Sequence, residues 1–339
     1  MSAIRFGSKL TELYFGSVFS QLTPKKEDDL KMYQGKKIPL SVTFSNTHRC
    51  NLVCSHCQSE NSDTADDIST KRILEIVDEV ADAGCLKLGF TGGEPLLRKD
   101  MPDVLQKCYD RKLVTTLVSN SFPVFRYIKD LRGLSLLFLS LDGNREVNDQ
   151  IRGKKSFDKF LEAVHLAKEN NIPVAALTTV SAMNMHVIED MCQIIEDLNI
   201  HWLVGVIQTQ FTGLHEQNHS QQQLQKMVQT ISKVKNLRTS KSYLDFVLGK
   251  RSLPKCFAGI GYTVISPEGK IFPCFPAQFD KAYPGISILD KNFKEAFDQL
   301  PLYRNTCDTC QLACHIETNY LYLFKFDNIY QSYKLTKVI

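Results

Sequence analysis

Three cysteines, Cys50, Cys54 and Cys57, are separated by only three and two residues. Thiolates are the ligands of iron–sulfur clusters, and a loop this short can place three of them at separate corners of a cubane. The next cysteine is Cys85, so this loop offers no fourth thiol and one iron would stay open. A zinc site and a redox dithiol are the alternatives, although structural zinc usually takes four protein ligands. The spacing therefore favours an iron–sulfur cluster.

Length and composition narrow the class of protein. The chain has 339 residues, 11 cysteines and a formal net charge of +4, which predicts no extended basic surface for nucleic acid. It shows no secretory signal pattern and no run of about 18 apolar residues, so we expect neither secretion nor a membrane-spanning helix. An odd number of cysteines in a reducing compartment indicates metal ligands plus buried thiols. We therefore expect a cytoplasmic metalloprotein.

From residue 40 onward, predicted strands alternate with predicted helices. Apolar runs indicate strands at 40–44, 86–90, 113–118, 134–141, 174–180 and 202–207. Helical spacing of apolar residues indicates helices at 68–83, 99–111, 157–170 and 184–198. Such alternation is typical of parallel βαβ units. We predict an α/β fold, a partial (β/α)6 TIM-like barrel whose chemistry lies at the carboxyl ends of its strands.

Polar and glycine-containing stretches follow the first four predicted strands. The three-cysteine loop follows the first strand and Thr91–Pro95 follows the second. Ser119 and Asn120 end the third strand, and Ser140 with Asp142-Gly143 ends the fourth. Because carboxyl ends of parallel strands meet at one rim, we expect these stretches to lie together.

The remaining sequence suggests further modules. Residues 208–255 predict one helix and a connector, and the Ser266–Gly269 turn predicts a hairpin between 261–265 and 270–274. We expect these domains: 1–38, an N-terminal helical extension; 39–250, the barrel; 251–315, a small hairpin and helix module; and 316–339, an aromatic tail. Both ends are rich in aromatic residues, which predicts packing on the barrel or, alternatively, a peripheral contact with a membrane.

Four segments together resemble the radical S-adenosylmethionine (SAM) superfamily: the three-cysteine loop, Gly92–Pro95, Leu139–Gly143 and Asn148–Gly153. The resemblance implies that the open iron chelates the amino and carboxylate groups of SAM. His56 stands where that family usually carries an aromatic ring. By the same resemblance, the residues expected to bind SAM are Gly92, Gly93 and Glu94 at its amino group, and Ser119, Asn120, Ser140 and Arg152 at its methionine, ribose or carboxylate.

The C-terminal cysteines resemble the SPASM and twitch domains of the same superfamily, which carry auxiliary [4Fe–4S] clusters. This part of the chain contains Cys256, Cys274, Cys307, Cys310 and Cys314. Two cubanes fully ligated by cysteine would need about eight thiols, so the five present imply one auxiliary cluster. The twitch-like set is Cys256, Cys274, Cys307 and Cys310, with Cys314 as a rival for either of the last two places. We expect Cys85, Cys108 and Cys192 to be buried apolar thiols.

The resemblance implies reductive cleavage of SAM to a 5′-deoxyadenosyl radical that abstracts a hydrogen atom from the substrate. We expect an oxidoreductase-type biosynthetic enzyme acting on a small molecule, namely a sugar, an aminocyclitol or a lipid precursor. The alternative is a maturase that crosslinks, epimerises or forms a thioether in a ribosomally made peptide. A non-catalytic iron–sulfur electron carrier is a remote alternative. A flavodoxin- or ferredoxin-type protein is the expected electron donor.

Overall fold

The computed structural model describes residues 37–57, 67–207, 219–254, 256–280, 283–301 and 310–322. The N-terminal extension up to residue 36, most of the aromatic tail and Cys307 lie outside these residues, so the predictions made for them stay predictions. Within the described residues the strands form a nine-stranded sheet in the order β6-β5-β4-β3-β2-β1-β7-β8-β9.

Six parallel strands form the main part of the sheet, each hydrogen-bonded to the next along the chain. They are β1 (Ser41–Ser45), β2 (Lys87–Thr91), β3 (Val114–Ser119), β4 (Leu136–Ser140), β5 (Val174–Val180) and β6 (His201–Val206). Each lies within two residues of its predicted bounds. Because β6 ends the sheet without pairing to the strand at the other end, the barrel is open. The predicted partial barrel is confirmed.

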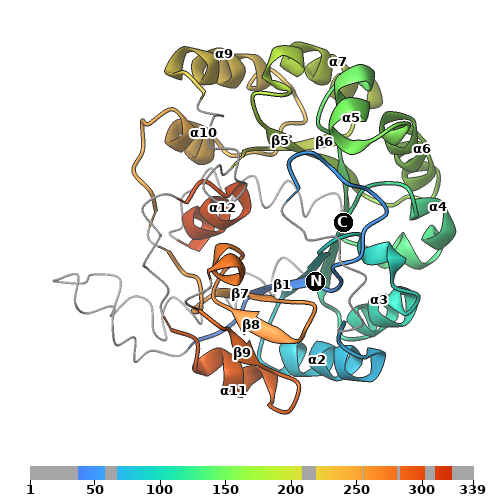
Figure 1. The fold of residues 1–339 in the computed structure, drawn as a ribbon, viewed down its shortest axis with the longest axis vertical. Coiled ribbons are helices and arrows are strands. Elements are labelled where there is room, and N and C mark those ends of the chain that lie inside the picture. Colours follow the sequence, from blue (N-terminus) through green and yellow to red (C-terminus); the bar gives the residue numbers. More distant parts are fainter. Residues whose placement is uncertain are drawn as a thin grey trace.

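Helices cover the outer face of these strands (Figure 1). They are α2 (Thr70–Asp82), α3 (Met101–Asp110), α4 (Val124–Tyr127), α5 (Arg145–Arg152), α6 (Ser156–Glu169), α7 (Ile188–Leu198), α9 (Gln221–Ile231) and α10 (Lys241–Val247). The first of these begins as its sequence predicts, since the Ser69 hydroxyl accepts a hydrogen bond from the Arg72 amide. Neither α4 nor α5, the helix that carries Arg152, was predicted from the sequence, and one helix was expected where α9 and α10 both form.

The two faces of the parallel strands differ in burial. In β2, Leu88 and Phe90 are fully buried against the helices, whereas Lys87, Gly89 and Thr91 on the opposite face are exposed or half-buried. Alternation of this kind follows from the two-residue period of a strand. The inner face of the sheet therefore remains accessible while the outer face belongs to the hydrophobic core.

The C-terminal hairpin extends the barrel sheet. Strand β7 (Tyr262–Ile265) pairs in parallel with β1, and β8 (Lys270–Phe272) returns antiparallel to it, followed by β9 (Ile286–Ser287) and α11 (Phe293–Asp298). The hairpin is confirmed, but its pairing with β1 was not expected. The last described helix, α12 (Ala313–Tyr322), lies inside the ring of outer helices, between α10 and the hairpin (Figure 1).

Close packing explains the position of α12. A Cβ atom added to Gly205 in β6 would lie 3.1 Å from Cβ of Ala313, so a glycine lets the helix approach the inner face of the sheet.

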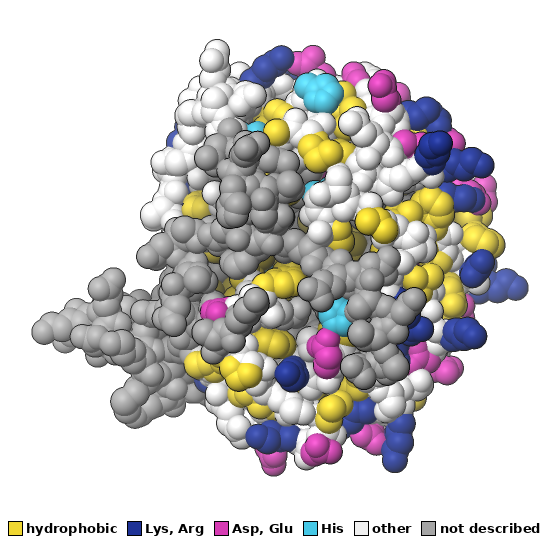
Figure 2. Space-filling model, in the orientation of Figure 1, with side chains coloured by type: hydrophobic (Ala, Val, Ile, Leu, Met, Phe, Trp, Pro, Cys, Tyr) yellow, Lys and Arg dark blue, Asp and Glu magenta, His cyan; other side chains and the backbone are white. Residues whose placement is uncertain are grey.

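Among the described residues, no helix is long and apolar enough to cross a bilayer. Charged side chains of both signs are interspersed along the top, right and lower edges of the view in Figure 2.

Candidate functional site

Backbone hydrogen bonds beside two glycines join the three-cysteine loop to the segment that follows β2. The Gly93 amide donates to the Thr47 carbonyl and the Glu94 amide to the Arg49 carbonyl, each at 2.8 Å. A Cβ atom on Gly93 would lie 2.2 Å from the Arg49 oxygen, and Gly92 adopts φ +133°. Only glycine tolerates this approach and this backbone angle. The glycine pair thus fixes the start of the cysteine loop, whichever ligand binds above it.

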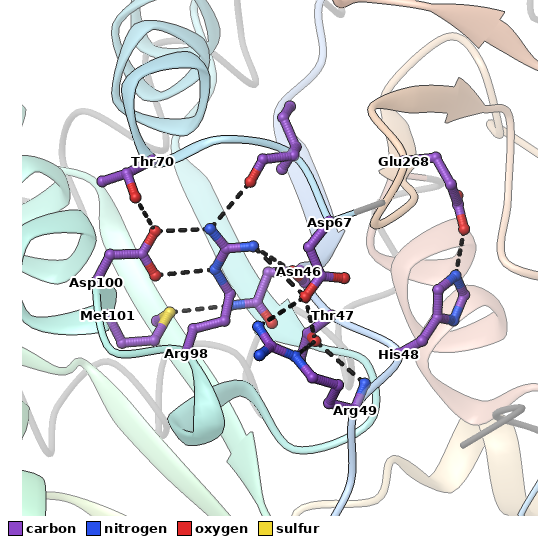
Figure 3. A network of polar contacts seen from close by, with 11 residues as sticks. Asn46, Thr47, His48, Arg49, Asp67, Thr70, Arg98, Asp100, Met101 and Glu268 are labelled. Carbon is purple, nitrogen blue, oxygen red and sulfur yellow. Dashed lines mark hydrogen bonds and ion pairs between the residues drawn. The ribbon is translucent and has the colours of Figure 1, made fainter. Parts of the chain in front are cut away.

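Arg98 anchors the start of the same loop from one side (Figure 3). The residue is only 5% exposed, and its guanidinium donates to the carbonyls of Asn46 and Ile68 at 3.1 and 3.0 Å. It also forms two hydrogen bonds to the Asp100 carboxylate, at 2.9 and 2.6 Å. A planar guanidinium with five donors can join a carboxylate and separate carbonyls at once. Arg98 therefore fixes the residues just before the first cysteine.

Asp67 and Glu268 add two further anchors. Asp67 accepts hydrogen bonds from the Thr47 hydroxyl at 2.7 Å and from Arg49 at 3.0 Å. In Figure 3, His48 points away from the Arg98 network toward Glu268, with which it pairs. This contact with His48 lowers the pKa of Glu268 to about 2. Glu268 lies in the turn of the C-terminal hairpin, so the C-terminal part of the sheet holds the cysteine loop directly.

Glu94 is completely buried beside the cysteine loop. Its carboxylate accepts hydrogen bonds from the Leu96 amide at 3.2 Å, the Ser119 hydroxyl at 3.1 Å and the Asn120 amide at 2.7 Å. Burial raises the pKa of Glu94 to about 7 in spite of these donors. Two of the predicted SAM-binding residues, Glu94 and Ser119, therefore contact each other. The Asn120 side chain donates to Cys50 Sγ at 3.7 Å and so links β3 to the first cysteine.

Arg152 and Asp142 form a buried ion pair behind the other two cysteines. Both Nε and one terminal nitrogen of Arg152 lie 2.6 Å from Oδ2 of Asp142, whose side chain is fully buried. Oδ1 of Asp142 accepts from the Thr179 amide at 2.9 Å, and Nε2 of His56 lies 3.5 Å from Oδ2. Arg152 was expected to face a ligand carboxylate, yet the carboxylate that it contacts here belongs to the protein.

Ser140, the last predicted residue of this group, ends β4 half-buried on the inner face, beside β5. Its position agrees with the expected rim of polar residues. Sequence reasoning assigned no role to Asp142, Arg98, Asp67 or Glu268. Asp142 follows directly after a strand that carries a predicted site residue, which was a usable signal. The other three had no comparable signal.

The three cysteines fit an iron–sulfur cluster in their chemistry. All three belong to one anchored loop, with Cys50 and Cys54 half-buried and Cys57 exposed. Burial raises the pKa of Cys54 to about 11, whereas the nearby positive charge of Arg152 lowers it. Metal binding requires thiolates, which Arg152 therefore favours. Among the described residues no three His, Cys, Asp or Glu side chains gather around one metal ion, whereas in a cubane each thiolate binds a separate iron.

A second group of thiols lies on the inner side of the sheet. It comprises Cys256, Cys274, Cys310 and Cys314. The charges of Cys256, Cys310 and Cys314 act on Cys274, whose pKa burial raises to about 12, so the four lie near one another. The Tyr262 hydroxyl lies 3.5 Å from Cys256 Sγ. Outside this group, Cys85 and Cys108 are buried as expected, whereas Cys192 is only half-buried.

The two thiol groups lie toward opposite ends of the same strands. The three-cysteine loop follows the carboxyl end of β1, whereas Tyr262, beside Cys256, is paired with Ser41 at the amino end of that strand. Four residues separate these levels, a length of about 13 Å along a parallel strand. The accessible inner face therefore runs between the two groups.

Comparison with known proteins gives a consistent result. Residues 45–198 match the model of the Radical SAM superfamily. The chain is 30% identical to the Fe-coproporphyrin III synthase of Methanosarcina barkeri over 204 residues, 56% of this chain and 51% of that protein. It is 27% identical to the PqqA peptide cyclase of Bradyrhizobium diazoefficiens over 71% of this chain and 68% of the cyclase. It therefore spans about half the length of the first of these relatives and two thirds of the second.

Two more similarities point the same way. The chain is 29% identical to the antilisterial bacteriocin subtilosin biosynthesis protein AlbA of Bacillus subtilis, over 77% of this chain and 60% of AlbA. The crystal structure of Streptococcus suis SuiB bound to S-adenosylmethionine superposes with a TM-score of 0.68 at 17% identity, covering 94% of this chain and 85% of SuiB. At this identity the superposition shows a shared fold.

Proposed function

Because the chain is a radical SAM enzyme with a C-terminal domain of the SPASM and twitch type, we propose that it modifies a ribosomally made peptide. The modification would be a crosslink, a thioether or an epimerised centre. This was the alternative in the sequence reasoning, and the relatives support it better than oxidation of a small molecule. The observation that carries it is the similarity to a peptide cyclase and to a bacteriocin biosynthesis protein, each over more than two thirds of this chain.

The superfamily uses a [4Fe–4S] cluster with SAM, and its SPASM members carry auxiliary clusters. When bound, this pair supplies reductive cleavage of SAM and a 5′-deoxyadenosyl radical for hydrogen abstraction. In our proposal Cys50, Cys54 and Cys57 hold the first cluster, and Asn120 donates a hydrogen bond to a ligating sulfur. Hydrogen bonds of this kind tune a cluster's reduction potential.

The other predicted SAM contacts divide by position. Gly92 and Gly93 present backbone at the rim, and Ser140 lies on the inner face. The guanidinium of Arg152 has five N–H donors and uses some of them on Asp142, so the others are available to a SAM carboxylate. Glu94 and Ser119 act in the proposal by holding Asn120, whose backbone amide donates to Glu94.

For the auxiliary cluster we propose Cys256, Cys274, Cys310 and Cys314 as ligands. Their mutual proximity supports this set. Cys307 lies outside the described residues and stays a sequence-based candidate for the fourth place. The accessible inner face between the two cysteine groups would receive the peptide segment to be modified. Both clusters would then lie within reach of the same substrate.

Co-expression with short open reading frames neighbouring the gene tests the proposal. Mass spectrometry of the purified peptides should find one whose mass falls by a pair of hydrogen atoms per crosslink, or one that exchanges a hydrogen on epimerisation in D2O. The matched control is a variant with Cys50, Cys54 and Cys57 all replaced by Ala, which should leave the peptide unchanged. A peptide modified equally by this variant would refute the proposal.

A small-molecule substrate is the second candidate, because a relative at 30% identity is named as a synthase of Fe-coproporphyrin III. Anaerobic assays of 5′-deoxyadenosine separate the two. Stimulation by a neighbouring peptide supports the maturase, whereas stimulation by a tetrapyrrole with no response to peptide supports the second candidate.

A further inference from the structure

Lys87 is the only Lys, Arg, Asp or Glu in the six parallel strands of the barrel. It begins β2, in the middle of the sheet, where apolar and small residues prevail. Since Leu88 and Phe90 face the helices, Lys87 lies on the opposite, inner face with Gly89 and Thr91. Protein surrounds the accessible side chain of Lys87, so negative charge nearby stabilises its ammonium.

The sheet register brings Lys87 to the C-terminal cysteine group. Ser41 pairs with Lys87 on one side and with Tyr262 on the other, so the three residues form one row across β2, β1 and β7. Neighbouring strands lie about 4.8 Å apart, which puts the Lys87 and Tyr262 backbones about 10 Å from each other. Tyr262 contacts Cys256 through its hydroxyl, and its ring packs on His315, the residue after Cys314, with centroids 5.1 Å apart.

The ionisable groups that act on the pKa of Lys87 are the thiols of two cysteines. Burial lowers the pKa of Lys87, and Cys314 and then Cys85 are the groups that act in the opposite direction. Lys87 in turn lowers the pKa of Cys314 against the effect of burial. No carboxylate of the described residues forms an ion pair with Lys87. Both side chains are accessible to solvent from the inner face, although protein surrounds them.

We propose that the Lys87 ammonium offsets the negative charge of an iron–sulfur cluster held by the C-terminal cysteines and so raises its reduction potential. The inference rests on the proposed auxiliary cluster. Adding an electron makes a thiolate-ligated cluster more negative, and a nearby cation in a partly desolvated space stabilises that reduced state. Lys87 is thus a positioning residue: it belongs to the barrel, yet it sets a property of the C-terminal site.

An EPR-monitored redox titration tests this role in full-length, anaerobically reconstituted protein. A variant in which Cys50, Cys54 and Cys57 are all replaced by Ala retains only the EPR signal of the auxiliary cluster. In that background Lys87→Met should lower the ratio of reduced to oxidised cluster about tenfold at the unsubstituted midpoint, equivalent to about 59 mV for one electron. Lys87→Arg should stay close to the unsubstituted protein. Lys71→Met, which removes an exposed lysine from α2 on the outer face, should cause no change.

Three results would overturn the proposal. They differ in whether the proposed auxiliary cluster is refuted together with the role of Lys87. An unchanged ratio in Lys87→Met with normal iron content refutes the role of Lys87 alone. Absence of iron in the triple-Ala background removes the auxiliary cluster itself, and the inference with it. An unchanged ratio, combined with a raised KM for the peptide when Lys87→Met is placed in the enzyme that keeps all its cysteines, would assign Lys87 to a substrate carboxylate. If Lys87→Met fails to fold, Lys87→Gln gives the same neutral test.

Discussion

Replacing Arg98 by Met should lower the free energy of unfolding by about 4 kcal/mol. The substitution leaves the carbonyls of Asn46 and Ile68 without their donor and the Asp100 carboxylate without its cation. Hydrogen bonds from a charged group contribute about 1.5–3 kcal/mol each, and breaking one side of a buried ion pair costs about 3–5 kcal/mol. These terms overlap and do not add, so we take about 4 kcal/mol, the middle of the range for the broken ion pair alone.

Urea unfolding of the metal-free protein measures this change. The chain has one tryptophan, Trp202, which is fully buried in β6, so its fluorescence reports unfolding of the barrel. Arg98→Lys should lose about 2 kcal/mol, because an ammonium reaches Asp100 but cannot span both carbonyls. Arg111→Met is the matched control: it removes a partly exposed arginine paired with Asp78 and Asp82, and should cost about 1 kcal/mol or less.

A free energy of unfolding for Arg98→Met within about 1 kcal/mol of the wild type would contradict this role of Arg98. Equal destabilisation by Arg98→Met and Arg111→Met would contradict it as well. A second readout is iron content after reconstitution. Since Arg98 fixes the residues just before Cys50, Arg98→Met should retain less iron at the first cluster than the Arg111→Met control does.

Arg152→Ala should weaken SAM binding more than tenfold in equilibrium dialysis, and an unchanged Kd would remove Arg152 from the site. Asp142→Asn should lower stability by about 3 kcal/mol, because Arg152 keeps a buried charge without its partner, and full additivity with Arg152→Met would contradict this coupling. The raised pKa of Glu94, about 7, means that the folded state binds its proton more tightly than the unfolded state does. Its stabilising contribution is therefore complete below about pH 4.5 and is lost as the pH rises through 7, by up to about 3 kcal/mol. Glu94→Gln should flatten this pH dependence of urea unfolding. Reconstituted protein should hold about eight irons as two clusters, and about four after replacement of Cys50, Cys54 and Cys57. Finding about twelve would contradict a single auxiliary cluster.

Local patterns predicted the strands well, because each parallel strand is a short apolar run in the sequence, bounded at both ends by a loop or a helix. The Ser69 cap and the hairpin turn at Ser266–Gly269 were equally readable. The helix Arg145–Arg152 was missed because only Val147, Asn148 and Ile151 are buried in it, too few to give a clear period. The pairing of β7 with β1 is a contact between distant parts of the chain, which no local pattern encodes.

The candidate site was likewise predictable only in part from the sequence. Residues at strand ends could be placed on one rim from topology alone. Their partners could not: Asp142 with Arg152, Arg98 with Asn46, and Glu268 with His48 all depend on side-chain packing. The sequence placed Lys87 in a predicted strand. Its proximity to Cys314 follows only from the register of three strands and the position of α12.

The pairing of β1 with β7 has a consequence for synthesis of the protein. On the ribosome, the strand that leads into the first cysteine loop emerges more than 200 residues before the strand that completes its hydrogen bonding. Until then β1 is an edge strand with free backbone donors and acceptors, a state prone to association with other chains. Glu268, which holds His48, emerges equally late. Stable loading of the cluster that we propose at the amino-terminal cysteines should therefore follow completion of the hairpin, so this maturation would be largely post-translational.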